Sequence, residues 1–326
     1  MKAVVCRQLG DIGGLAIEDV DTPRPGEGEI LIDVAAAGLN FADLLMISGR
    51  YQGRREPPFV PGLELAGRVG AVGAGVNELS VGQRVLAPVD SGAFAEKVIA
   101  RANDVVPLPD TIDDVTAAGF AIAYGTSHGA LEWRAHLQPG ERLLVHGAAG
   151  GVGLTAVEIG KRMGAHVTAT ARGDDKLAVA RSHGADEVID SGSDDLVGLL
   201  KAAHDGAGFD VVYDPVGGAM FDASLRAMAW EGRLLCIGFA SGEVPKIPAN
   251  ILLVKNLAAL GLYWGSYRRK DPVRLRRSLG TLLAWHGEGT LKPLVSATFP
   301  MERVVEALEQ LRSRRSQGKV VLTMRG

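Results

Sequence analysis

The segment at residues 146–153, His-Gly-Ala-Ala-Gly-Gly-Val-Gly, constrains the fold of this chain more than any other stretch. An apolar run at 143–145 leads into it, and apolar residues at 152, 156, 159 and 163 follow at the spacing of one helix face. A strand therefore enters a glycine-rich turn and a helix leaves it. Small residues let the backbone approach a pyrophosphate, and the helix N-terminus offers free N–H groups to it. The segment predicts a dinucleotide-binding turn that includes Ala149, Gly150, Gly151 and Val152.

Short apolar strands and helices alternate downstream of this turn. Strands are expected at 142–146, 166–171, 187–189, 209–213, 233–237 and 258–263, and helices from 151, around 175–183, at 194–204 and at 219–229. This alternation predicts a parallel, doubly wound sheet that binds its ligand beyond the carboxyl ends of the strands. The turns at 147–153, 172–176, 214–218 and 238–241 are expected to converge there.

The flanking regions have a different pattern. Residues 1 to about 120 contain short apolar runs separated by glycine and proline turns, which predicts a small β-barrel or sandwich. An alanine-rich helical stretch follows at 113–138. After residue 264, helices are expected at 272–286 and 301–313, and the short apolar run at 320–322 is expected to return to the first domain. A chain of 326 residues fits two such domains.

Composition narrows the possible partners and location. The net charge is -3, from 35 basic and 38 acidic residues, so no nucleic acid or anionic membrane surface is expected as a partner. The two cysteines, Cys6 and Cys236, lie too far apart in the sequence for a disulfide framework, which favours a reducing compartment. We find no signal-peptide pattern and no apolar run of membrane-spanning length. The sequence predicts a cytoplasmic protein.

The residues after the second predicted strand indicate which dinucleotide binds. NAD sites place an acidic residue there for the ribose 2′-hydroxyl, whereas this strand ends with Arg172 and Gly173, and Lys176 follows. Two cationic side chains suit a 2′-phosphate. Asp174 and Asp175 lie between them, and we interpret these as first-turn acids of the next helix. NADPH is therefore favoured over NADH.

Six motifs spread over the chain point to one family. They are residues 38–43 (GLNFAD), 61–67 (PGLELAG), 124–126 (YGT), 146–153 (HGAAGGVG), 260–265 (LGLYWG) and 318–321 (GKVV). With these motifs the chain resembles the zinc-free medium-chain dehydrogenases/reductases of the quinone oxidoreductase family, which includes zeta-crystallin. The resemblance implies a GroES-like β-rich domain at 1–123, a Rossmann domain with a doubly wound parallel sheet at 124–263, and a return to the catalytic domain at 264–326.

The same motifs argue against a catalytic metal. Zinc-dependent relatives carry a cysteine where Asn40 stands and a histidine where Leu63 stands. Neither residue of this chain offers zinc a thiolate or an imidazole. Two cysteines are also too few for the four-cysteine structural zinc lobe of those relatives. The resemblance therefore implies no metal, and hydride addition to an acceptor that is already electrophilic.

Asn40 and Tyr51 are the catalytic candidates that the resemblance implies, at positions that line the cleft near the nicotinamide. Asn40 would bind a ribose hydroxyl or a substrate oxygen, and Tyr51 would stack on the acceptor or donate to developing negative charge. Two plainer roles stay open, because Asn40 could cap a helix and Tyr51 could pack against the barrel rim. Many relatives carry a second tyrosine where this chain has Leu45, which predicts a more apolar pocket.

The resemblance also implies a set of cofactor contacts. Its members, besides the glycine turn and Asn40, are Thr126, Arg172, Gly173, Lys176, Ser191, Gly238, Phe239, Tyr263 and Trp264. Phe239 and Trp264 would serve equally well as core or dimer-interface aromatics. His128, His146 and His286 have no partner that the sequence identifies, and we interpret them as structural.

These observations predict an NADPH-dependent reductase that transfers hydride to a quinone or related conjugated carbonyl. A 2-enoyl thioester or alkenal reductase is an alternative within enzymes, and an NADPH-binding protein with little catalysis is an alternative outside them. Six cations at 268–277 form either a solvated helix face or a dock for a phosphate-bearing thioester. A homodimer is expected, because the strand at 258–263 is an edge that relatives pair across a two-fold axis.

Overall fold

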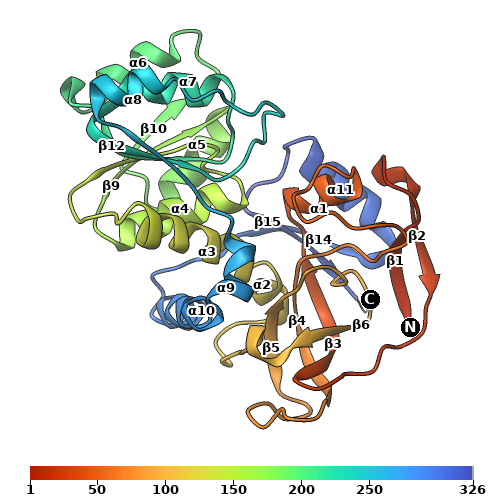
Figure 1. The fold of residues 1–326 in the computed structure, drawn as a ribbon. Coiled ribbons are helices and arrows are strands. Elements are labelled where there is room, and N and C mark those ends of the chain that lie inside the picture. Colours follow the sequence, from red (N-terminus) through yellow and green to blue (C-terminus); the bar gives the residue numbers. More distant parts are fainter. Residues whose placement is uncertain (325–326) are drawn as a thin grey trace. The chain divides into compact units, whose positions relative to one another are not determined.

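The computed structural model describes residues 1–324, which form two compact units (Figure 1). The first unit contains residues 1–122, 267–287 and the stretch from 293 onward, and the second contains 123–266 and 288–292. The C-terminal segment therefore contributes to the β-rich unit, while the short piece at 288–292, expected in the returning segment, groups with the second unit. No helix among residues 1–324 has the combination of length and apolar character needed to cross a membrane.

The first unit is built on a mixed sheet with the strand order β14-β15-β3-β4-β5-β7, in which β6 also pairs with β3, and on a separate β1-β2 hairpin. Its strands are β1 (Lys2–Cys6), β2 (Leu15–Asp19), β3 (Glu29–Gly38), β4 (Glu64–Val72), β5 (Arg84–Pro88), β6 (Lys97–Arg101), β7 (Val106–Pro107), β14 (Val295–Pro300) and β15 (Lys319–Thr323). Its helices are η1 (Ile12–Gly14), α1 (Phe41–Ile47), η2 (Ala102–Asp104), α2 (Asp114–Ala118), α9 (Tyr267–Lys270), α10 (Pro272–Gly287), η6 (Met301–Arg303) and α11 (Val304–Arg312).

Strand β3, at the centre of this sheet, explains why the C-terminal segment returns to the first unit. Strand β3 pairs antiparallel with β4 and with β15, and Val321 of β15 lies opposite Gly38. The apolar side chains of β15 thereby join the core formed by the N-terminal strands, where Val320 and Leu322 are fully buried. The short run at 320–322 is thus a strand of the first unit, as the sequence predicts.

The second unit is a six-stranded parallel sheet with the order β10-β9-β8-β11-β12-β13. Its strands are β8 (Arg142–Val145), β9 (His166–Ala171), β10 (Glu187–Asp190), β11 (Phe209–Asp214), β12 (Met228–Cys236) and β13 (Ala258–Gly261). Its helices are α3 (Ala121–His128), η3 (Gly129–Arg134), α4 (Gly151–Arg162), α5 (Asp174–Ser182), α6 (Leu196–Ala202), η4 (Ala203–Gly206), α7 (Ala219–Ala227), α8 (Ala249–Lys255) and η5 (Trp264–Ser266). In sequence numbering this is the 3-2-1-4-5-6 order of a dinucleotide-binding fold, which confirms the predicted doubly wound sheet.

The helices of the second unit cover both faces of its sheet. Helices α6, α7 and α8 run along one face, and α4 lies on the other (Figure 1). A core that includes Leu144, Phe209 and Phe221 fills the space under α6–α8. One expected boundary was wrong: the helix predicted at 219–229 ends at Ala227, because Met228 already pairs with Phe209 as the first residue of β12.

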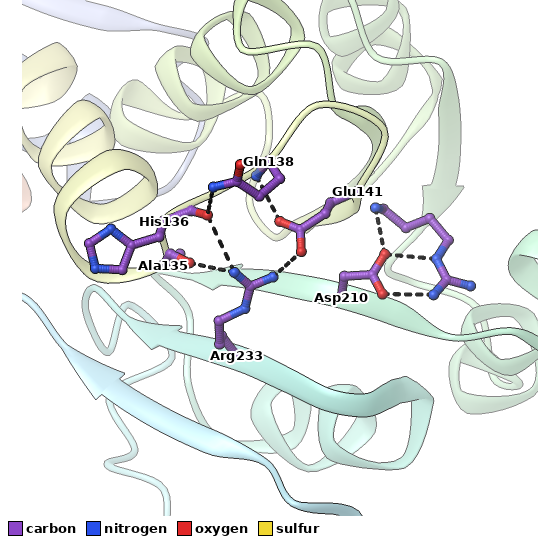
Figure 2. A network of polar contacts seen from close by, with 7 residues as sticks. Ala135, His136, Gln138, Glu141, Asp210 and Arg233 are labelled. Carbon is purple, nitrogen blue, oxygen red and sulfur yellow. Dashed lines mark hydrogen bonds and ion pairs between the residues drawn. The ribbon is translucent and has the colours of Figure 1, made fainter.

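Ion pairs hold together the amino ends of the central strands. Asp210 of β11 accepts from the backbone N of Arg142 at 2.8 Å and from its guanidinium at 2.7 and 2.9 Å. Arg233 of β12 pairs with Glu141 and donates to the Ala135 carbonyl (Figure 2). These contacts fix the edge of the sheet opposite the one where a dinucleotide would bind.

Candidate functional site

The glycine-rich turn of the second unit has the geometry of an anion cradle. Strand β8 ends at Val145, and Gly147 then adopts φ +58°, a conformation that favours glycine. Helix α4 begins at Gly151, and its N-cap residue Gly150 provides no side chain to the first-turn amides. A Cβ on Gly153 would collide with the Gly147 carbonyl, so the tight turn requires glycine there. The first-turn N–H groups are therefore open to an anionic ligand.

The turn lies where the strand order reverses. Strands β9 and β10 extend from one side of β8, and β11, β12 and β13 extend from the other. His146 N donates to Tyr213 O at 3.0 Å, which ties the start of the turn to β11. The ligand site of a doubly wound sheet lies at this crevice. The His146 side chain is fully buried and hydrogen-bonded to Thr170 and Ser224, so it is structural, as interpreted from the sequence.

The side chains predicted to hold the adenosine phosphate lie at the carboxyl ends of β9 and β10. Arg172 is exposed just after β9, and Ser191 N donates to Ala171 O at 2.9 Å across the strand pair. Gly173 has φ +87° and is the N-cap residue of α5, whose first turn contains Asp174, Asp175 and Lys176. Both acids are thus helix-terminus residues, as interpreted from the sequence.

An acidic group at this edge was missed. Asp190 ends β10, and its Oδ1 accepts from Gly192 N at 2.9 Å and lies 3.4 Å from Gly173 N. A Cβ on Gly192 would lie 3.2 Å from Arg172 Nε and 3.3 Å from Asp190 Oδ1, so both side chains flank that glycine. In the usual NAD pattern the acidic residue follows β9, whereas this acid comes from the neighbouring strand β10.

The remaining cofactor candidates occupy loops of the same unit. Thr126 lies in α3, and Trp264 packs against Gly125 so closely that a Cβ there would meet the indole ring at 2.5 Å. Trp264 is 5% exposed and therefore occupies a core position, one of the roles that the sequence left open for it. Tyr263 is half exposed. Gly238 follows β12, and Phe239 lies beside Gly217. The loops after β11 and β12 are therefore in contact, as expected for strand ends that meet.

In the first unit, Asn40 belongs to a buried polar network. Asn40 follows β3, Glu64 begins β4 and Lys319 begins β15, so three paired strands bring the side chains together. Asn40 Nδ2 donates to Glu64 Oε1 at 2.9 Å. Lys319 Nζ donates to Asn40 Oδ1 at 2.7 Å, to Glu64 Oε1 at 2.9 Å and to Leu39 O at 2.6 Å. A carboxylate and an ammonium thus fix the orientation of the Asn40 amide.

The network leaves Asn40 little spare hydrogen-bonding capacity. The second N–H of its amide has only a long contact, 3.4 Å, to Gly38 O. A ligand oxygen can therefore replace that contact without breaking the bonds to Glu64 or Lys319. Asn40 is also the N-cap residue of α1, the plainer role left open from the sequence, and Asp43 of the same capping box accepts from Asn40 N at 2.7 Å. Asp43 is fully buried, and burial is the main cause that raises its pKa to about 7.

Tyr51 lies on a pocket at the other end of α1. The pocket has a volume of about 250 Å³ and is lined by Leu9, Met46, Gly49, Tyr51, Gly53, Arg54, Arg55, Glu56 and Pro57. Tyr51 N donates to Leu45 O at 3.1 Å, which anchors the loop to the helix. Asn40 and Tyr51 therefore flank one short helix of the first unit.

The residues around Asn40 do not suit a zinc ion. Leu63 is buried at 6% exposure, and of the two nearby carboxylates, Glu64 is paired with the ammonium of Lys319 and Asp43 accepts from Asn40 N. Among residues 1–324, no set of three imidazole, thiolate or carboxylate groups converges there. Zinc prefers thiolate and imidazole ligands, and a fixed cation beside the carboxylates opposes a second one.

The basic stretch is in part the solvated face expected from the sequence, because Lys270, Arg274 and Arg277 are exposed, and in part an ion-paired surface. Arg268 is 7% exposed and pairs with Asp104 at 2.8 Å and with Asp90 at 2.9 Å. Arg269 also reaches Asp90 at 2.9 Å, and Arg276 reaches Glu78 at 3.1 Å. Both interpretations from the sequence were incomplete, because the acids that pair with Arg268, Arg269 and Arg276 lie 164 to 198 positions earlier in the chain.

Glu64 and Lys319 are the functional candidates that the sequence analysis missed. Both fall inside motifs that carry the resemblance, at 61–67 and 318–321, but no role followed from spacing alone. The sequence pattern that could have indicated them is a single charged residue within each of two otherwise apolar motifs. Such charges require a partner.

Comparison with known proteins covers both units. A model described as alcohol dehydrogenase GroES-like domain matches residues 26–110, and one described as zinc-binding dehydrogenase matches 151–277. A quinone oxidoreductase-like protein 2 homolog from Nematostella vectensis is 40% identical over 98% of this chain and 88% of its own length. Escherichia coli quinone oxidoreductase, solved in complex with NADPH, is 30% identical, with a TM-score of 0.91 over 99% of this chain and all of that one. The enoyl reductase CurK is 26% identical, with a TM-score of 0.90 over 99% of this chain and 98% of that one.

Proposed function

Because the chain belongs to the quinone oxidoreductase family of medium-chain dehydrogenases/reductases, we propose that it is an NADPH-dependent reductase of a quinone or related conjugated carbonyl. The second unit is the cofactor domain in this proposal, and the first unit carries the acceptor-binding residues Asn40 and Tyr51. The GroES-like and Rossmann organisation matches that of the E. coli enzyme over its full length.

The cofactor assignment rests on the turn and on the charges beyond it. The open amides of α4, at Gly151 and Val152, would hold the pyrophosphate, and Arg172 and Lys176 would hold the 2′-phosphate. Ser191, next to Arg172 across the strand pair, would add a hydroxyl. Asp190 is the feature that opposes a 2′-phosphate, so the preference for NADPH over NADH depends on Arg172 outweighing it.

The fixed orientation of Asn40 is the observation that carries the acceptor assignment. Lys319 and Glu64 hold its amide where zinc-dependent relatives have a metal ligand. A site without a Lewis acid suits an acceptor that needs no polarisation, such as a quinone. Bound NADPH supplies hydride from C4 of its nicotinamide. The residues of this chain orient the acceptor, with one Asn40 N–H and the Tyr51 hydroxyl directed to its oxygens, and water delivers the proton.

A panel of acceptors tests this function. Loss of NADPH absorbance would be followed with a benzoquinone, a naphthoquinone, an alkenal and crotonyl-CoA, with NADH in parallel reactions. We expect turnover with the quinones and a preference for NADPH. Turnover with crotonyl-CoA alone would make the protein an enoyl reductase. Tight NADPH binding without turnover of any acceptor would place it with non-catalytic NADPH-binding proteins.

Enoyl reduction is the second candidate because CurK has the same fold over the full chain. Half of the six cations that would bind a thioester phosphate are engaged, since Arg268, Arg269 and Arg276 each pair with a carboxylate. Quinone reduction therefore stays the first candidate.

The assembly and location remain part of the proposal. Strand β13 is the edge of the parallel sheet, and we propose that this edge pairs with a second copy to form a homodimer. Both cysteines are free thiols, which fits a reducing cytoplasm.

A further inference from the structure

Two histidines and a glutamate gather at the amino edge of the parallel sheet, away from the predicted cofactor turn. They are His166 at the start of β9, Glu187 at the start of β10 and His204 in η4. One potential ligand atom from each lies within 4.8 Å of the other two. We propose that these three side chains bind a divalent first-row metal ion, with Zn²⁺ the expected occupant.

The sheet register explains why the side chains meet. Glu187 lies opposite Thr168 in the β9–β10 pair, and His166 lies two residues before Thr168. Alternate residues of a strand share a face, and residues in register on parallel neighbours do too. His166, Thr168 and Glu187 therefore project from one face of the sheet. This is the face that α6 covers, and His204 follows α6 directly.

Contacts within the cluster orient both rings. The His166 and His204 rings meet edge to face, with 4.9 Å between centroids. His204 Nε2 lies 3.1 Å from Thr168 Oγ1, a contact of the kind that orients metal-binding imidazoles from outside the first coordination sphere. His204 adopts φ +54°, in the left-handed region that non-glycine residues rarely occupy. The ring is thus held over the sheet by its backbone and by Thr168.

An unsatisfied atom points to a missing partner. His166 Nδ1 is buried and has no hydrogen-bond partner in the structure. A buried polar atom without a partner costs free energy, and a metal ion would satisfy it. Glu187 is exposed, so an ion can enter from solvent. Arg142, at the start of the neighbouring strand β8, is paired with Asp210, which limits its repulsion of a bound ion.

The donor set selects the class of ion. Two imidazoles and one carboxylate suit Zn²⁺ and its first-row neighbours, whereas Mg²⁺ and Ca²⁺ prefer oxygen ligands alone. Tetrahedral Zn²⁺ at its usual bond lengths brings donor atoms to about 3.4 Å from one another. The donor atoms must therefore close by up to about 1.4 Å, and rotation of the exposed Glu187 side chain can bring its carboxylate toward the two imidazoles. Water would fill the fourth position.

Metal binding to the untagged full-length protein tests the proposal. Titration with Zn²⁺ in a calorimeter should give one site per chain and raise the Tm, and Co²⁺ in the same site should give visible d–d absorption. The variants His204→Asn and Glu187→Gln should each weaken Zn²⁺ binding by at least about 100-fold, since loss of outer-sphere partners alone costs about 10–100-fold. Asparagine tolerates the left-handed backbone at position 204.

The chain provides a matched control in His136. It also has positive φ, +50°, and its ring points away from the Arg233 network to which its carbonyl belongs (Figure 2). His136→Asn therefore makes the same exchange in the same backbone conformation outside the cluster, and Zn²⁺ binding should be unchanged. Equal loss in His136→Asn, or unchanged binding in Glu187→Gln, would overturn the proposal. Failure of the wild-type protein to bind Zn²⁺ would do the same. None of these readouts depends on reductase activity.

Discussion

Lys319 Nζ donates to Asn40 Oδ1 at 2.7 Å, although 279 positions separate the two residues in the chain. The pairing of β15 with β3 brings the two residues together, so a residue of β15 orients the side-chain amide of Asn40, which follows β3. Gly119 leaves room for the lysine stem, because a Cβ there would lie 3.2 Å from three of its carbons. The return of the C-terminus is therefore part of the candidate site and not only of the fold.

Removal of the Lys319 ammonium should destabilise the protein strongly. In Lys319→Met, Glu64 is left as a buried carboxylate without its cation, and we expect a loss of about 3–5 kcal/mol in the free energy of unfolding. Urea denaturation measures it. Lys319→Met/Glu64→Gln should recover part of this loss, because the uncompensated charge is gone. A double variant no more stable than Lys319→Met would contradict a role for charge pairing. Arg303→Met, at an exposed pair with Glu306, serves as the control and should change stability little.

The second unit was largely predictable because its signals are local. The turn at 147–153, the helix-ending glycines and the alternating runs each report on neighbouring residues, and the parallel order follows from that alternation. The wrong boundary at 227–229 arose because pairing between Met228 and Phe209 decides where the helix ends. Such pairing is not visible in helix periodicity.

The site of the first unit was predictable only in part. Asn40 and Tyr51 were found through the resemblance, but their surroundings depend on contacts distant in sequence. Lys319 and Glu64 lie 255 positions apart, and Arg268 meets Asp104 over 164 positions. No spacing rule joins such residues, so the roles of these charges became clear only when strand register placed them together.

Arg172 should govern the choice between NADPH and NADH. In Arg172→Ala we expect the KM for NADPH to rise about 10–100-fold, the effect of losing a hydrogen bond to a charged group, with little change for NADH. Initial rates at varied cofactor concentration measure it. Arg181→Ala, in the last turn of helix α5, which begins two residues after Arg172, is the matched control and should leave both KM values unchanged. Equal losses with both cofactors would show that Arg172 does not recognise the 2′-phosphate.

A carboxylate at Gly150 should block the anion cradle. Gly150 has φ -85°, so its backbone conformation allows a side chain. The Cβ of any substituted residue would lie 3.3 Å from Gly147 O, so this contact is the same in every variant. Gly150→Asp places negative charge beside the pyrophosphate, and we expect NADPH binding to weaken at least about tenfold more than in Gly150→Asn, or about 1.4 kcal/mol. Fluorescence titration of NADPH gives both dissociation constants. Similar constants for the two variants would mean that crowding, and not charge, determines the loss.

The edge strand β13 predicts the assembly. Light scattering during size exclusion should give twice the chain mass of 34.2 kDa. Backbone amides of β13, at 258–261, should exchange with deuterium more slowly at concentrations that favour the dimer, because strand pairing would engage them. A monomer mass at every concentration would remove the dimer proposal, and a dimer with unprotected β13 amides would move the interface elsewhere.

The buried carboxyl of Asp43 should make stability depend on pH in an unusual direction. Burial raises its pKa from 3.8 to about 7 in the folded protein. Between these values the folded state holds a proton that the unfolded chain has released, so this group's contribution to stability is full below about pH 4 and is lost as pH rises to 7. Asp43→Asn cannot titrate. The stability of the wild-type protein minus that of Asp43→Asn should therefore fall from pH 4 to 7, by at most about 1.4 kcal/mol per pH unit, and level off above 7. Urea denaturation gives the free energy of unfolding of both proteins at each pH. In the difference between the two values, the contributions of groups that titrate alike in both proteins cancel. A flat difference would show that Asp43 is ionised in the folded state, and the network around Asn40 would then hold two carboxylates against the single ammonium of Lys319.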